Sequence, residues 1–158
     1  QVIGDALVWP GHGFASCRDF TGVGVSDDMI LMLSDALYRE AAAPSLVKVG
    51  QAFGGLAFHS CGDWSAKLGM IRSLKGIRMA DGAFSPETDP SPNAPDGFPE
   101  ILAQSGIVLN ARIVGEPKRI VSTVRRLWRP GMRLIVNTYC STPEKQEEAY
   151  RRIHEICV

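Results

Sequence analysis

The sequence has no excess of charge of either sign and no long apolar run. Its 158 residues include 17 basic and 17 acidic side chains, so the formal net charge is zero. A balanced chain has no surplus of basic surface, and we therefore expect neither a nucleic acid nor a membrane as partner. No apolar run approaches the roughly 20 residues of a membrane-spanning helix. The N-terminus also lacks the basic start and long apolar core of a secretory signal.

Cysteine is sparse, and its spacing is irregular. The four cysteines are Cys17, Cys61, Cys140 and Cys157. A chain of this length can bury a hydrophobic core without covalent cross-links, unlike the small secreted domains that depend on disulfides. We therefore expect a reduced, cytoplasmic protein.

Apolar runs typical of strands alternate with segments typical of helices from residue 22 onward, whereas residues 1–21 predict irregular structure with one short strand at Ala6–Trp9. This alternation predicts a single α/β domain in which parallel strands are joined by outer helices. A proline-rich stretch at 82–97 predicts a long loop, and Pro44 is expected to kink or split the first helix. The predicted strands are 23–25, 56–61, 77–80, 107–114 and 134–140, and the predicted helices are 34–51, 65–74, 98–104, 117–129 and 142–156.

Polar side chains collect where these strands end, which is the edge at which parallel sheets carry their chemistry. His59 and Cys61 close one strand two positions apart, so we expect both side chains on one face. Cys140 closes a later strand and is the natural third ligand. One imidazole and two thiolates favour zinc and leave a fourth position open, as in catalytic sites. Alternatively, each cysteine fills the core, where single cysteines are common, and His59 is a hydrogen-bonded polar residue without a metal.

Four further polar residues are candidates for the same site. Asp27 and Asp28 are candidates for a catalytic acid/base pair or for substrate anchors, and equally for caps of the turn that follows. Asn110 and Arg112 share strand parity and are candidates for binding a substrate carboxylate or sulfonate.

Asp81 ends the third predicted strand and has its own pair of interpretations. It is a candidate for an additional metal ligand, or for a hydrogen bond that orients His59.

Taken together, several segments resemble the uroporphyrinogen decarboxylase superfamily. Its zinc-dependent corrinoid:thiol methyltransferase branch, typified by methylcobalamin:coenzyme M methyltransferases, is the most similar. The paired His-x-Cys and the distant cysteine are the most specific elements of a resemblance that covers roughly residues 22–157. The matching segments are Gly24–Asp28, Leu33-Ser34 with Tyr38 and Pro44, His59–Gly62, and Cys140 before Thr142–Glu144.

This resemblance implies a (β/α)8 TIM barrel with Zn²⁺ held by His59, Cys61 and Cys140. It implies methyl transfer from methylcobalamin, carried on a partner corrinoid protein, to a small zinc-activated thiol. A complete barrel takes about 250 residues, so we expect the chain to be a partial domain, the C-terminal half of the barrel. Its open sheet edges would then need a second copy of the chain, as a homodimer, or the missing N-terminal half-barrel.

Two alternatives remain at this point. One is a metal-free uroporphyrinogen decarboxylase, a tetrapyrrole carboxy-lyase of porphyrin biosynthesis, with Asp27 or Asp28 as the acid/base group. Decarboxylases resemble this chain less, because they carry a glycine-rich segment at His59–Cys61 and a histidine at Cys140. The other alternative is a non-catalytic fragment in which zinc has four protein ligands and serves only to stabilise the fold.

Overall fold

A parallel five-stranded sheet organises the protein, in strand order β1-β2-β3-β4-β5. The structure is a computed structural model and describes residues 22–157, so the short strand predicted at Ala6–Trp9 lies outside the described residues. The architecture confirms the predicted α/β class. The strands are β1 (Val23–Ser26), β2 (Leu56–His59), β3 (Ile77–Ala83), β4 (Val108–Arg112) and β5 (Arg133–Asn137).

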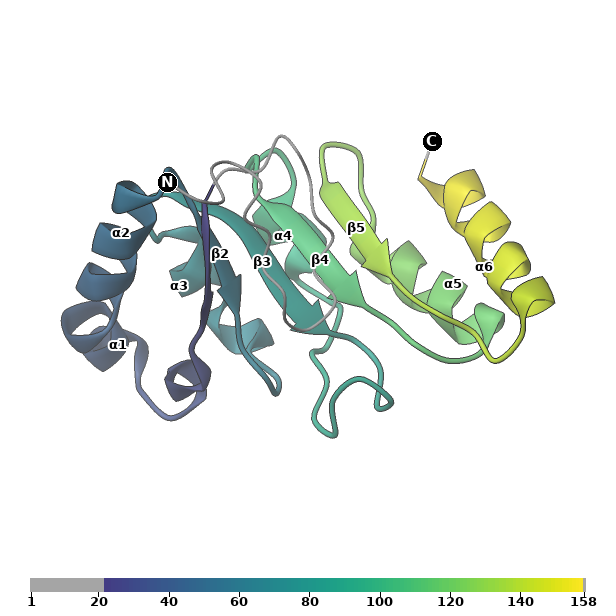
Figure 1. Cartoon of the computed structure of the whole chain (residues 1–158), viewed down its shortest axis with the longest axis horizontal. Coiled ribbons are helices and arrows are strands. Elements are labelled where there is room, and N and C mark those ends of the chain that lie inside the picture. Colours follow the sequence, from purple (N-terminus) through teal and green to yellow (C-terminus); the bar gives the residue numbers. More distant parts are fainter. Residues whose placement is uncertain (1–21, 158) are drawn as a thin grey trace, which may run out of the picture.

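Helices connect successive strands and flank the sheet. Figure 1 shows α3, α4 and α5 behind the sheet, with α1 and α2 beside β1 and α6 beside β5. The α-helices are α1 (Asp35–Ala41), α2 (Ala43–Ala52), α3 (Leu68–Arg72), α4 (Phe98–Leu102), α5 (Pro117–Leu127) and α6 (Pro143–Ile156), and the short 3-10 helices are η2 (Asp28–Leu31) and η3 (Ser65–Lys67). Within the described range no helix has both the length and the apolar character needed to cross a bilayer.

Local sequence accounts for where the helices begin. The Ser34 hydroxyl accepts the Leu37 N–H at 3.2 Å and so caps α1, as N-terminal serines commonly do. Pro44 lies in the first turn of α2, where it needs no hydrogen-bonding N–H. The predicted single helix over 34–51 is therefore split in two, which is one of the two outcomes expected from Pro44.

A cluster of aromatic rings packs under the sheet near the end of β2. Trp64 is fully buried, and its ring lies edge-on to Phe58 and Phe98, with centroid distances of 6.3 and 5.3 Å. Trp64 approaches β3 so closely that a Cβ at Gly82 would lie 3.0 Å from its Cζ2 atom. The loop after β2 is thus anchored to the hydrophobic core.

Several strand boundaries differ from the prediction: β2 ends at His59 and not at Cys61, and β4 is shorter than the predicted 107–114. β3 continues three residues past Ala80, because Asp81, Gly82 and Ala83 stay in register with β4. β5 ends at Asn137, which pairs with the last residue of β4, so Cys140 lies in the following loop and does not close the strand.

Candidate metal centre

Three adjacent strands place a polar row on one face of the sheet, near its carboxyl edge. His59 of β2 is in register with Asp81 of β3, which is in register with Asn110 of β4, and all three side chains are fully buried. The Asp81 carboxylate lies 2.5 Å from His59 Nδ1 and accepts hydrogen bonds from Asn110 Nδ2 at 2.6 Å and Arg112 Nε at 3.1 Å. The guanidinium balances the carboxylate charge, which lets the pair be buried.

The contact with Asp81 sets the orientation of the His59 ring. A proton on Nδ1 satisfies Asp81 and puts the lone pair on Nε2, the arrangement found in metal-binding histidines. His59 Nε2 lies 3.6 Å from Cys61 Sγ. In a tetrahedral zinc site with Zn–N near 2.05 Å and Zn–S near 2.3 Å, the two donor atoms lie about 3.6 Å apart. The spacing of these side chains therefore suits a shared tetrahedral ion.

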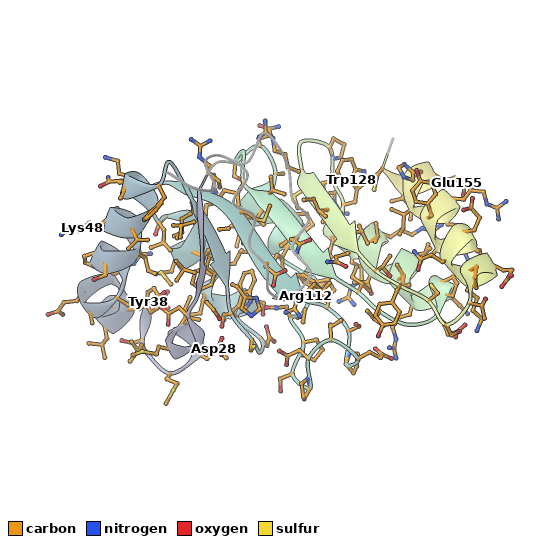
Figure 2. All side chains as sticks on the ribbon, in the orientation of Figure 1. Asp28, Tyr38, Lys48, Arg112, Trp128 and Glu155 are labelled. Atoms are coloured by element: carbon orange, nitrogen blue, oxygen red, sulfur yellow. The ribbon has the colours of Figure 1, made fainter. Side chains whose placement is uncertain are left out.

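Asp28 supplies a carboxylate at the same place. Donor atoms of Asp28, His59 and Cys61 all lie within 4.8 Å of one another, and this is the group of potential metal ligands that residues 22–157 bring together. Asp28 Oδ1 also accepts the backbone N–H of Cys61 at 2.8 Å. In Figure 2, Asp28 and Arg112 both lie along the edge at which the strand arrows end. The candidate metal centre thus contains nitrogen, sulfur and oxygen donors.

Cys140 is not part of this group, although both the strand pattern and the family resemblance predict it as a ligand. Its backbone N–H donates to Gln146 Oε1 at 2.8 Å, and the charges that act on its thiol are those of Glu116, Lys145 and Glu148. β5 is the third strand along from β2, a separation of about 14 Å at a strand spacing of about 4.8 Å. β5 ends at Asn137, three residues before Cys140, and α6 begins at Pro143. Cys140 therefore lies in the loop that leads to α6 and not at the end of the strand.

The electrostatic surroundings of Cys61 are anionic. Burial raises the pKa of its thiol, and the negative charges of Asp28 and Asp89 raise it further, while Arg112 lowers it by a smaller amount. A thiol in such surroundings stays protonated unless a cation compensates the carboxylates. A divalent ion is therefore a better occupant of this site than an anionic ligand.

Asp27 has a structural role, although it is one of the predicted catalytic residues. Its Oδ1 accepts the Met29 N–H at 3.1 Å, and its Oδ2 accepts the Tyr38 hydroxyl at 2.7 Å. The capping interpretation is thus confirmed for Asp27, which begins η2 and places the next residue, Asp28, beside Cys61. With both oxygens engaged, Asp27 is a poor candidate for proton transfer.

Asn110 and Arg112 lie on the same face of β4, as strand parity predicts, and both contact Asp81. Each also retains an unused polar atom: Asn110 Oδ1 and Arg112 Nη2 are buried and have no hydrogen-bond partner among the described residues. Unsatisfied buried polar atoms are rare in proteins and point to a ligand or water. Their predicted role in substrate binding stays a prediction.

The loop between β3 and α4 contributes two residues that the sequence patterns do not single out. Asp89 Oδ2 accepts the Gly62 N–H at 2.8 Å, and Asn93 Oδ1 accepts the Trp64 N–H at 2.9 Å. Gly62 has a φ of +72°, and a Cβ there would lie 2.6 Å from Leu31 Cδ1, so only glycine fits this turn. The proline-rich composition of 82–97 predicts a loop but not these contacts.

Comparisons with known proteins return no match to this chain among family models, curated proteins or solved structures.

Proposed function

We propose that this chain is a zinc-dependent methyltransferase that moves a methyl group from a methylated corrinoid protein to a small thiol. The observation that carries the proposal is the 3.6 Å separation of His59 Nε2 and Cys61 Sγ, with Asp81 orienting the imidazole from behind. The resemblance of the His-x-Cys segment to corrinoid:thiol methyltransferases supplies the reaction type. The donor-atom spacing and the resemblance both concern His59 and Cys61.

We further propose that the sheet is half of a (β/α)8 barrel. Its strands follow one another in sequential order, whereas a doubly wound sheet reverses its order at a switch point. The polar row also lies at the carboxyl edge, where barrels carry their active sites. The remainder of the barrel would come from a second copy of the chain or from an N-terminal half.

In the proposed reaction, a bound Zn²⁺ would supply Lewis acidity that favours the thiolate form of the acceptor. His59 and Cys61 would hold the ion, and Asp81 would keep the imidazole in the required tautomer. The thiol releases its proton to solvent, and its sulfur forms a bond to the methyl carbon. The cobalt–carbon bond breaks at the same time and leaves its electron pair on cobalt, so the products are a methyl thioether and the reduced corrinoid.

The unused polar atoms of Arg112 and Asn110 favour a methyl-accepting thiol that carries a polar group. The buried Nη2 of Arg112 is a cationic donor without a partner among the described residues, which suits a carboxylate or sulfonate on the thiol. Asn110 Oδ1 would accept a hydrogen bond from the substrate or from a water that accompanies it.

A second chemistry has one observation in its favour. Cys61, His59 and Asp81 follow the order of a nucleophile, a base and an orienting carboxylate, as in cysteine hydrolases. However, the carboxylates of Asp28 and Asp89 raise the pKa of the Cys61 thiol, whereas an activated cysteine requires a lowered one. The electrostatics therefore favour metal binding over a thiol nucleophile.

The direct test is metal content followed by methyl transfer. Protein purified and reconstituted under reducing conditions should bind one Zn²⁺ per chain, and His59→Ala should lose it. With methylcobalamin as donor and 2-mercaptoethanesulfonate as acceptor, the zinc form should consume methylcobalamin, and the metal-free form should not. A folded protein that binds no zinc would refute the proposal, and metal-free decarboxylation of uroporphyrinogen would favour the carboxy-lyase alternative.

A further inference from the structure

We propose that Asp28, and not Cys140, is the third protein ligand of this metal centre, giving an aspartate, histidine and cysteine donor set. The inference rests on the metal site proposed above and changes its composition. It is carried by the grouping of the donor atoms of Asp28, His59 and Cys61 within 4.8 Å, from which Cys140 is absent.

The backbone around Asp28 holds its carboxylate in place. Asp27 caps η2, and the turn that follows directs Asp28 toward the loop after β2. Asp28 Oδ1 accepts the Cys61 N–H at 2.8 Å, which leaves the second carboxylate oxygen for an ion. Asp28 is therefore fixed relative to the thiol of Cys61 before any metal enters.

Asp28 also has no counter-charge among residues 22–157. Asp81 is balanced by Arg112, but no ion pair within residues 22–157 involves Asp28. A divalent cation held by one carboxylate and one thiolate is electrically neutral, as it is with two thiolates. A site with Asp28 in place of the second thiolate thus has the same net charge, but it replaces a soft sulfur ligand with a hard oxygen ligand.

The change of donors has a consequence for metal choice. A single thiolate selects zinc less strongly over cobalt, nickel or manganese than two thiolates do, because oxygen donors suit the harder ions. Three protein ligands still leave one position of a tetrahedral ion for a thiol. The inferred site is therefore compatible with the proposed reaction but less selective in the metal it accepts.

Zinc titration of matched variants tests the inference. Asp28→Asn keeps an oxygen that can accept the Cys61 N–H and removes the anionic ligand, so zinc affinity should fall roughly tenfold or more. Cys140→Ser should bind zinc within about twofold of the unaltered chain. Asp63→Asn is the control for loss of a nearby carboxylate, since Asp63 is exposed and bonds only the Ser65 N–H among the described contacts, and it should bind zinc normally.

Cobalt substitution gives a second readout that does not depend on affinity. One thiolate-to-cobalt charge-transfer band should appear in the Co²⁺ form, vanish in Cys61→Ser and persist unchanged in Cys140→Ser. Loss of zinc or of charge-transfer intensity in Cys140→Ser overturns the inference but leaves the proposed function standing. Normal zinc affinity in Asp28→Asn also overturns it, whereas failure of the unaltered chain to bind any metal refutes the proposed function itself.

Discussion

The two cysteine-bearing ends of the sheet have similar sequences but different surroundings. At each, an apolar strand is followed by a cysteine and then by a turn toward a helix. β2 has paired strands on both sides. The Cys61 N–H donates to Asp28 of η2, which follows β1, and the charge of Asp89 in the loop after β3 acts on the Cys61 thiol. β5 is paired on one side only within the described residues, and Cys140 contacts α6 instead.

The difference shows that a site at a sheet edge depends on the neighbouring strands as much as on its own strand. Asp28 follows β1, Asp81 lies within β3, and both act on the segment that follows β2. Within residues 22–157, the loop after β5 has no neighbouring strand beyond β5 to contribute such a group. Similar local patterns can therefore give a cluster of potential metal ligands in one place and a thiol without such a cluster in another.

Of the substitutions considered around Cys61, that of Asp81 should lower the free energy of unfolding the most. In Asp81→Asn, the partly buried Arg112 loses its counter-charge and His59 loses an ionic partner. Breaking a buried charge pair in this way should lower the free energy of unfolding by about 3–5 kcal/mol. Urea denaturation of the metal-free protein measures the change.

Asp96→Asn is the matched control, because Asp96 forms an ion pair with Arg126 at an exposed position. Its unfolding midpoint should stay close to that of the unaltered chain, as for most surface ion pairs. Equal destabilisation by the two variants would contradict the special role of the buried network.

Zinc should distinguish the thiols by their reactivity. Alkylation proceeds through the thiolate, so an ion bound at Cys61 should slow its modification by iodoacetamide roughly tenfold or more, while Cys140 keeps its rate. Burial raises the pKa of both thiols, so without metal both rates should continue to rise at pH values where an ordinary cysteine is already ionised. Mass spectrometry of peptides resolves the two sites, and equal protection of Cys140 would show that it too binds the ion.

The smallest expected change in stability comes from the hydrogen bond between Tyr38 and Asp27, the residue that precedes Asp28. Tyr38→Phe removes the hydroxyl that donates to Asp27 and should cost about 1 kcal/mol. Burial and the neighbouring Asp27 raise the pKa of Tyr38, so the folded state keeps the phenolic proton above about pH 10, where an unfolded tyrosine loses it.

The free energy of unfolding should therefore fall as the pH rises above about 10, and Tyr38→Phe should reduce that dependence. Parallel denaturation curves at pH 8 and pH 10.5 measure the difference. An unchanged pH dependence in Tyr38→Phe would show that the hydroxyl is not buried against Asp27.

Strand periodicity explains which parts of the site could be predicted. The alternation of side chains along a strand is a local property, and it correctly grouped Asn110 with Arg112. The expected position of Asp81 at the end of a strand led to the prediction that it could bond His59, which the structure confirms. His59 and Cys61 also approach each other as expected, even though β2 ends at His59.

Contacts between loops were not predictable in the same way. Asp28 reaches Cys61 across 33 positions of sequence, and Asp89 reaches Gly62 across 27. Such contacts depend on where each turn directs the chain, which no repeating pattern encodes. Cys140 was expected to close a strand, but β5 ends at Asn137, and the path of the chain beyond it depends on contacts of the same kind.

The polar row at Asp81 also bears on the order of folding events. Its hydrogen bonds come from β2 and β4, so the imidazole of His59 acquires its orientation only when three strands are in register. A metal ion would then recognise a completed sheet and would not nucleate its assembly. Zinc added during refolding should accordingly slow unfolding while leaving the refolding rate of the sheet unchanged.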